Sequence, residues 1–213
     1  MNARAPGRPR ILSRERIVTM ARRIADDEGL DALTVRRVAQ RLGTGQASLY
    51  RHIEDRDELL RLLAEDVAVH LPGPRKCPDV REQVIGQWLD AYDYLSQHRW
   101  AARIIAEGEH VADGASAFAE SALGTLRVLA GGTAESRADI ARVYRVLWHL
   151  LLGHVLNAHP VGHTRSEGAG PESAHEAGDA DAVPVPGPPG ASVSRDDLAW
   201  ALPRVLDGML GTL

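Results

Sequence analysis

The spacing of apolar residues constrains the fold most, because they recur at intervals of three and four along nearly the whole chain. No stretch alternates apolar and polar residues for long enough to build a sheet. A period near 3.6 is typical of helices that bury one face, whereas half-buried strands have a period of two. The sequence therefore predicts an all-α protein.

Four helices are predicted in the first third of the chain, each bounded by residue types that begin or end helices. Ser13, Thr34 and Asp55 are N-cap types, and Glu58 follows Asp55 at the spacing of a capping box. Gly29 and Gly43 stand just after the first two helices, where glycine often ends a helix. The predicted helices span residues 13–27, 34–42, 46–52 and 55–71.

The rest of the chain is predicted to form a helical bundle interrupted by one long loop. Residues 159–193 are rich in Gly, Pro, Ser and acidic residues without periodicity, so we expect a mobile loop there. Ser194 marks a new helix start, and Pro203 should break or kink the helix that follows. The remaining predicted helices span residues 79–97, 99–107, 115–130 and 135–157.

The motif Pro72-Gly73-Pro74 closes the fourth helix, and we place a domain boundary there. The predicted domains are residues 1–71 and residues 72–213. Residues 1–61 hold 13 arginines against nine carboxylates, whereas the remainder is acidic, and the net charge of the whole chain is -4. A polyanion should therefore meet the amino-terminal domain and be repelled by the other.

Two short predicted helices, residues 34–42 and 46–52, are separated by a short turn that contains glycine, which is the form of a helix-turn-helix. Helical spacing turns one set of side chains inward to lock the pair together: Val38, Ala39, Leu42, Leu49 and Ile53. The same spacing leaves another set outward: Arg36, Gln46, Ser48, Tyr50 and His52. Gln can pair with an adenine edge, Arg and hydroxyl groups can hold phosphates, and the Ala47 methyl can touch a thymine methyl.

The residues of this region resemble the DNA-binding domain of the TetR family of transcriptional regulators. The resemblance runs through residues 17–30, 33–43, 47–53 and 55–60, and covers about a third of the chain. The most specific part is Leu49-Tyr50 followed by His52, a charged turn and Leu59-Leu60. The resemblance implies a three-helix DNA-binding domain with a helix-turn-helix, which binds double-stranded operator DNA.

The resemblance also implies roles by position. Arg36 and Gln46 match base-reading residues, Tyr50 and His52 match phosphate and groove contacts, and Thr34 matches a cap that can meet phosphate. Ala47 stands where the tetracycline-repressor type has a proline, and Arg56 replaces a lysine that approaches the DNA backbone. Arg8, Arg10 and Arg14 are candidates for a basic arm along the DNA, with a solvated tail as the alternative.

The second half resembles the ligand-binding and dimerisation domain of the tetracycline-repressor type, on the motif from Trp148 to Leu156 and on the final apolar helix. This implies a homodimer through helices near residues 135–157 and 195–213. Both helices are apolar over a broad face, which independently favours burial against a partner. The aromatics of this half are candidate ligand contacts, with core packing as the alternative: Trp88, Tyr92, Trp100, Phe118, Tyr144 and Trp148.

No cofactor and no metal site are predicted. His149 and His154 lie five residues apart, about 140° around a helix, and cannot converge on one ion as an i, i+4 pair would. His98 is one of several histidines near helix ends for which packing or surface roles are expected. The acidic run of residues 26–28 is interpreted as a solvated helix end.

Cys77 is the only cysteine, which fits a reducing cytoplasm, and an inert thiol is favoured for it. The first ten residues lack the apolar core of a signal peptide, and no stretch approaches 18 uninterrupted apolar residues. We therefore expect a cytoplasmic protein that does not enter the membrane.

The sequence favours a repressor that an unidentified small molecule releases from its operator. An enzyme with an active site in the carboxy-terminal helical pocket is the alternative, although no nucleophile motif, catalytic carboxylate pair or phosphate loop is recognised. A third hypothesis, an architectural DNA binder without a ligand, is disfavoured by the large second domain. The effector, the operator sequence and the choice between repressor and activator stay open.

Overall fold

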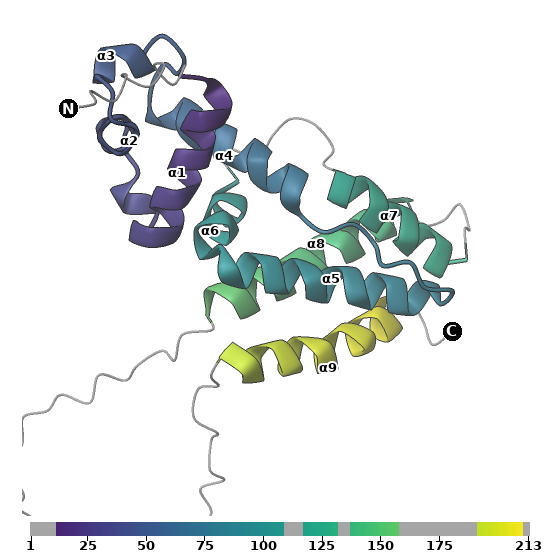
Figure 1. The fold of residues 1–213 in the computed structure, drawn as a ribbon. Coiled ribbons are helices and arrows are strands. Elements are labelled where there is room, and N and C mark those ends of the chain that lie inside the picture. The colour runs from purple at the N-terminus through teal and green to yellow at the C-terminus, as the bar shows by residue number, and fades with distance from the viewer. Residues whose placement is uncertain (1–11, 109–116, 132–136, 158–190, 211–213) are drawn as a thin grey trace, which may run out of the picture.

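The computed structural model describes residues 12–108, 117–131, 137–157 and 191–210, and every regular element within these ranges is a helix (Figure 1). The all-α prediction is confirmed. The elements are α1 (Arg14–Glu28), the 3-10 turn η1 (Leu30–Ala32), α2 (Val35–Leu42), α3 (Gln46–Leu49), α4 (Arg56–His70), α5 (Val80–Gln97), α6 (Arg99–Glu107), α7 (Ala117–Leu129), α8 (Arg137–Leu156) and α9 (Ala191–Leu210).

The helices gather in two groups (Figure 1). Residues 12–70, termed the head, contain α1, which packs against α2 and α4, and α3, which packs against α2. Helices α5 to α9, termed the body, form the second group. The second half of α4 contacts α6 and α7, and α1 also contacts α6, so the head meets the body along two helices.

The predicted helix starts of the head are confirmed by local hydrogen bonds. The Ser13 hydroxyl oxygen accepts from the Arg16 amide at 3.3 Å, and the Asp55 carboxylate accepts from the Glu58 amide at 2.8 Å. Only half of the predicted capping box forms, because the Glu58 carboxylate accepts from the Glu54 amide and pairs with Arg14 instead. Glu58 thereby ties the start of α4 to the start of α1.

Each group of helices has its own apolar interior. In the head, the buried side chains come from every helix, and they include Ile17, Ile24, Leu33, Val38, Leu49, Ile53, Leu59 and Leu63. In the body, α5 lies centrally and packs against α6, α7, α8 and α9. Its fully buried side chains, Val84, Trp88 and Leu95 among them, form the middle of that core.

The third predicted helix is shorter than expected. Helix α3 ends at Leu49, and Tyr50 to His52 form a turn in which the amides of His52 and Ile53 both donate to the Leu49 carbonyl. This turn brings Ile53 back into the core. The prediction of a helix from residue 46 to residue 52 was therefore wrong in its last three residues.

The predictions for the last helix were wrong in two respects. Helix α9 begins at Ala191 rather than near Ser194, so residues 191–193 belong to it and not to the predicted loop. The helix also continues through Pro203, so of the predicted break or kink the break is wrong, while the kink stays a prediction. Leu198, Leu202 and Leu206 are buried on both sides of the proline, and this packing outweighs the lost backbone hydrogen bond.

Two arginine contacts further fix α9 against α5. Arg81 donates to the Pro203 carbonyl at 3.0 Å and forms an ion pair with Asp207 at 2.6 Å. Arg195 donates from two nitrogens to the two carboxylate oxygens of Asp93. Other predicted features lie outside the described residues: Arg8 and Arg10 of the basic arm, residues 159–190 of the loop, and the first residues of the helices predicted from 115 and 135.

Candidate nucleic-acid interface

The head holds α3 in place through buried side chains of its neighbours. Val38 and Ala39 of α2, Leu49 of α3 and Ile53 are all buried, as predicted, while Leu42 is half-buried. The Thr34 hydroxyl oxygen accepts from the Arg37 amide at 3.1 Å and begins α2. Gly43 ends it with a φ of 66°, a backbone conformation that favours glycine. Two short helices thus meet rigidly across a three-residue turn.

The residues predicted to face outward form one surface on α2, α3 and the turn after it, termed the α2–α3 surface. Its members are Thr34, Arg36, Gln46, Ala47 and Tyr50, which are exposed, with Ser48 and His52, which are half-buried. The Gln46 amide nitrogen donates to the Tyr50 hydroxyl oxygen at 3.1 Å, so these two side chains are aligned before any ligand binds. The surface offers hydroxyl, amide and guanidinium groups to solvent.

Arg36 differs from the other arginines of α2. Arg37 donates to Glu28 through two nitrogens at 2.9 Å, and Arg41 reaches the same carboxylate at 2.5 Å. Hydrogen bonds from Arg37 and from Arg41 lower the pKa of Glu28, which therefore stays charged at neutral pH. Within the described part of the chain, the Arg36 guanidinium has no hydrogen bond or ion pair, so it is available to an outside anion.

Two predicted DNA contacts have other partners in the structure. Arg56 donates to the carbonyls of Leu33 at 3.0 Å and Leu30 at 3.2 Å, and so fastens the start of α4 to η1. Arg14, a candidate for the basic arm, donates to the His52 carbonyl at 3.2 Å and pairs with Glu58. Both guanidinium groups stabilise the head internally, because backbone carbonyls and a buried carboxylate lie within their reach.

Arg51 is a candidate that the sequence interpretation missed. It is exposed directly after Tyr50, and it makes no hydrogen bond or ion pair with any described residue. Its position next to Tyr50, in a segment rich in arginine, could have indicated this candidate from the sequence. Arg36 of the α2–α3 surface and Arg51 of the turn after α3 are thus two exposed cations without a partner among the described residues.

A chain of polar contacts joins the head to the body. Arg22 of α1 pairs with Asp66 of α4 at 3.0 Å, and its other nitrogen lies 3.3 Å from the Tyr94 hydroxyl and 3.1 Å from His98 Nε2. His98 Nδ1 lies 2.7 Å from Asp26. Because Arg22 can only donate, His98 Nε2 must accept, and the imidazole proton is then on Nδ1 and points to Asp26.

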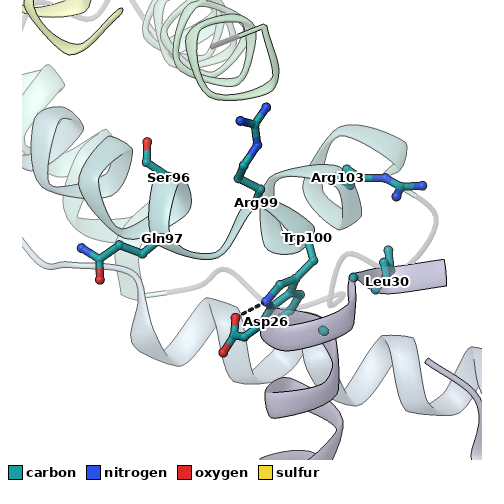
Figure 2. Close-up of a pocket in the computed structure, with 9 residues that line it drawn as sticks. Asp26, Leu30, Ser96, Gln97, Arg99, Trp100 and Arg103 are labelled. Carbon is teal, nitrogen blue, oxygen red and sulfur yellow. Dashed lines mark hydrogen bonds between the residues drawn. The ribbon is translucent and has the colours of Figure 1, made fainter. Parts of the chain in front are cut away.

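The same Asp26 oxygen accepts from the Trp100 indole nitrogen at 2.5 Å (Figure 2). These contacts, from Asp66 through Arg22, His98 and Asp26 to Trp100, are termed the relay. Of the relay residues, Asp26 and Trp100 line a cleft of about 320 Å³ between the end of α1 and the corner of α5 and α6. Residues 26–28 are exposed, as expected for a solvated helix end, but Asp26 also bonds His98 and Trp100, which the sequence interpretation did not anticipate.

Replacing Asp26 with alanine should lower the free energy of unfolding by about 1–3 kcal/mol, because Trp100 and His98 lose a shared acceptor and Trp100 is only 4% exposed. Urea unfolding measures this change. Asp31→Ala is the matched control, because Asp31 is 87% exposed and its pair with Arg103 spans 3.5 Å. The control should cost less than about 0.5 kcal/mol. Equal losses in the two variants would contradict a structural role for the relay.

The structure brings four of the six predicted ligand-contact aromatics together. Trp88, Phe118, Tyr144 and Trp148 form one cluster with ring centroids 5.3–6.2 Å apart. Burial raises the pKa of Tyr144, so its hydroxyl stays protonated at neutral pH. Tyr92 is buried on the same helix as Trp88. Trp100 lies apart from the cluster, in the relay.

The outer side of α9 carries apolar side chains that the described residues do not cover. Trp200 is 63% exposed, Met209 is partly exposed, and Arg204 lies over the Trp200 ring at 4.0 Å.

None of the described helices is long and apolar enough to cross a membrane. Among these same residues, no group of three potential ligands gathers around a possible metal position.

Comparison with known proteins places these features in context. Residues 17–63 match the family model described as bacterial regulatory proteins, tetR family. The HTH-type transcriptional repressor DrrR1 of Streptomyces coeruleorubidus is 38% identical over 90 residues, which are 42% of this chain and 31% of that protein. The chain spans between 31% and 60% of the length of the first curated relatives it matches.

Two solved structures extend the similarity to the body. ActR of Streptomyces coelicolor, a TetR family protein, is 35% identical over 68% of this chain and 70% of ActR, with a TM-score of 0.55. ActR has also been solved in complex with actinorhodin. BioQ of Mycobacterium smegmatis, solved with its double-stranded DNA operator, has the same fold over 95% of this chain and 100% of BioQ, at a TM-score of 0.64 and 21% identity.

Proposed function

Because the chain belongs to the TetR family of bacterial regulatory proteins, we propose that it is a repressor that binds operator DNA as a homodimer and is released by a small molecule. The observation that carries the proposal is the α2–α3 surface, where Arg36, Gln46 and Tyr50 stand exposed on a rigid, fully packed scaffold. DrrR1 is named a repressor, and ActR and BioQ have been solved with a ligand and with an operator. These relatives also favour a regulator over the enzyme hypothesis.

Each head is proposed to place α3 in the major groove of duplex DNA. Arg36 and Gln46 would read base edges, and the Ala47 methyl would contact a thymine methyl. Thr34, Ser48, Tyr50 and His52 would hold phosphates on either side, with Arg51 added from the structure. Arg56 would act on DNA indirectly, by fixing η1 and α4 beneath this surface.

Gln46→Ala should relax base preference more than it weakens total binding. The amide of Gln46 can pair with both polar atoms of an adenine edge, a contact that discriminates by about 1–3 kcal/mol, or about 5- to 150-fold, at one base pair. The measurement is the affinity for operators substituted one base pair at a time. Ser48→Ala is the control, because its hydroxyl should hold phosphate and carry no base preference. An unchanged preference profile in Gln46→Ala would contradict the assignment.

Two copies are proposed to pair through α8 and α9, which correspond to the predicted dimer helices near residues 135–157 and 195–213. The exposed Trp200 and Met209 of α9 support this proposal, because such side chains favour burial against a partner. A two-fold dimer presents two α3 helices, and these would enter successive major grooves about 34–36 Å apart.

Release would follow from a change in the separation of the two heads. We propose residues 1–71 as the DNA-binding domain and residues 72–213 as the effector-binding and dimerisation domain. An effector at the aromatic cluster of the body would favour a separation that no longer matches the grooves. The relay and the contact of α4 with α6 are the paths by which a shift in α5 or α6 reaches the head.

A salt-dependent gel shift on the DNA that flanks the protein's own gene tests the proposal. A regulator should retard one segment specifically, and its affinity should fall steeply as salt concentration rises, because bound phosphates release counterions. Competition with unrelated duplex DNA separates specific from general binding. Retardation of every segment to the same extent would favour the architectural binder, and no retardation at all would favour the enzyme hypothesis.

A further inference from the structure

The turn that follows α3 carries three candidate DNA contacts but has little regular structure of its own. Helix α3, at the end of the head away from the body (Figure 1), is a single turn of helix, Gln46–Leu49. Tyr50, Arg51 and His52 come after its end. One turn of helix is not stable by itself, because its few hydrogen bonds do not offset the cost of ordering the backbone. Contacts with other elements must therefore fix the place of these three residues.

Arg14, at the start of α1, and Glu58, in the first turn of α4, hold this turn from two sides. Arg14 Nε donates to the His52 carbonyl at 3.2 Å, while Nη2 of the same guanidinium pairs with the Glu58 carboxylate. The other Glu58 oxygen accepts from the Glu54 amide at 2.5 Å. Ile53, between the two anchored residues, is 1% exposed and lies in the core. The backbone is thus fixed at three successive residues directly after Arg51.

The Arg14–Glu58 pair is not an ordinary surface ion pair. The Glu58 side chain is 7% exposed, whereas that of Arg14 is 57% exposed. A buried carboxylate needs both a cation and hydrogen bonds, and Glu58 has Arg14, the Glu54 amide and, at 3.6 Å, Arg61. Two of the three Arg14 side-chain nitrogens therefore face the protein, which distinguishes Arg14 from a side chain that reaches freely toward a phosphate.

We infer that Arg14 and Glu58 are positioning residues for DNA binding, which act through the turn after α3 and set where the Arg51 guanidinium meets the phosphate backbone. The inference rests on the proposed function, because it assumes that the head binds operator DNA. Arg51 is exposed and has no partner among the described residues, so only the turn directs its side chain. Position 14 then requires the two-point geometry of arginine and not merely a positive charge.

Arg14→Lys separates this role from that of a basic arm, because lysine keeps the charge and replaces the planar fork with one nitrogen. The probe is the duplex segment retarded in the gel shift described above. The variant should bind it at least about tenfold more weakly, because a charge-assisted hydrogen bond to DNA is lost in each head. The slope of log affinity against log salt concentration should become shallower by about 1.8 per dimer, about 0.9 for each lost phosphate contact. Unchanged affinity and slope would overturn the inference.

Combination with Arg51→Ala shows whether Arg14 acts through the turn. Arg51→Ala alone should show the same loss as Arg14→Lys, and the double variant should bind within about threefold of Arg51→Ala. Independent contacts would multiply to a loss of about a hundredfold, which would overturn the inference. Arg23→Lys is the matched control, since Arg23 is exposed further along α1, and it should keep both the affinity and the salt slope.

Glu58→Gln tests the second anchor without changing α1. Glutamine keeps the size of the side chain and an oxygen that can accept from the Glu54 amide, but it removes the charge that holds Arg14. The salt slope should become as shallow as in Arg14→Lys. The lost negative charge would by itself strengthen binding to a polyanion, so a steeper slope or tighter binding in Glu58→Gln would overturn the inference.

Urea unfolding of each variant shows whether it is folded under the conditions of the binding assay. If neither Arg14→Lys nor Glu58→Gln folds, the pair supports the head as a whole, and a specific positioning role is wrong. Failure of the proposed function has a different signature. No specific retardation by the wild type would contradict that function and this inference with it, whereas specific retardation with a normal salt slope in Arg14→Lys would contradict the inference alone.

Discussion

Arg36→Ala should weaken operator binding by about 2–6 kcal/mol per dimer, because one guanidinium contact to a guanine contributes about 1–3 kcal/mol and each operator is contacted twice. Arg36 is exposed on α2 and, among the described residues, has no internal partner, so its removal should not disturb the head. Fluorescence anisotropy with a labelled operator measures the loss. Urea unfolding of the same variant should match the wild type within about 0.5 kcal/mol.

Arg23→Ala is the matched control for this substitution. Arg23 is also exposed in the head and unpaired within the described chain, but it lies on α1, away from the α2–α3 surface. It removes the same charge and should affect affinity only through weak, salt-screened attraction. If Arg23→Ala and Arg36→Ala weakened binding equally, the contribution of Arg36 would be general electrostatic attraction and not a contact in the groove.

Trp200→Glu should dissociate the dimer and thereby abolish operator binding at nanomolar protein concentration. Trp200 is the most exposed large side chain of α9. A tryptophan at the centre of an interface contributes about 2–4 kcal/mol to the free energy of association, and a two-fold dimer contains two such residues. The glutamate adds a charge that would have to be buried facing its own copy. Sedimentation velocity should show a dimer for the wild type and a monomer for the variant.

Val128→Glu is the control for the dimer prediction. Val128 has the same exposed fraction as Trp200, 63%, but lies on α7 in the body. It should leave the sedimentation coefficient and the operator affinity unchanged. A monomeric wild type would contradict pairing through α8 and α9, and so would a Trp200→Glu variant that remains dimeric at the same concentration.

Helix starts could be predicted from the sequence because the chemistry that begins a helix is local. Ser13, Thr34 and Asp55 each hydrogen-bond an amide three residues ahead, and no distant residue is needed. The helix through Pro203 could not be predicted in this way, since its continuity depends on α5 and α8 packing around buried leucines. At Glu58 the local prediction held only in part. The Glu58 amide donates to the Asp55 cap as predicted, but the Glu58 carboxylate pairs with Arg14, 44 residues away in the sequence.

The exposed part of the candidate interface could also be predicted, because helical spacing alone separates Arg36 from Val38 and Gln46 from Leu49. The partners of charged residues could not be predicted from helical spacing. Asp26 meets His98 and Trp100 at separations of 72 and 74 residues, and nothing within the acidic run indicates these contacts. For the same reason the sequence placed Trp100 with the other body aromatics, although it faces the head.

Selection of random duplex oligonucleotides by the full-length protein tests the central claim most directly, because it presupposes neither a target gene nor an effector. The account predicts enrichment of one inverted-repeat motif, with half-site centres one helical turn, about 34–36 Å, apart, and loss of this enrichment in Arg36→Ala. Recovery of unenriched sequence after repeated rounds, or of a single half-site without its inverted copy, would contradict a dimer that reads DNA through two α2–α3 surfaces.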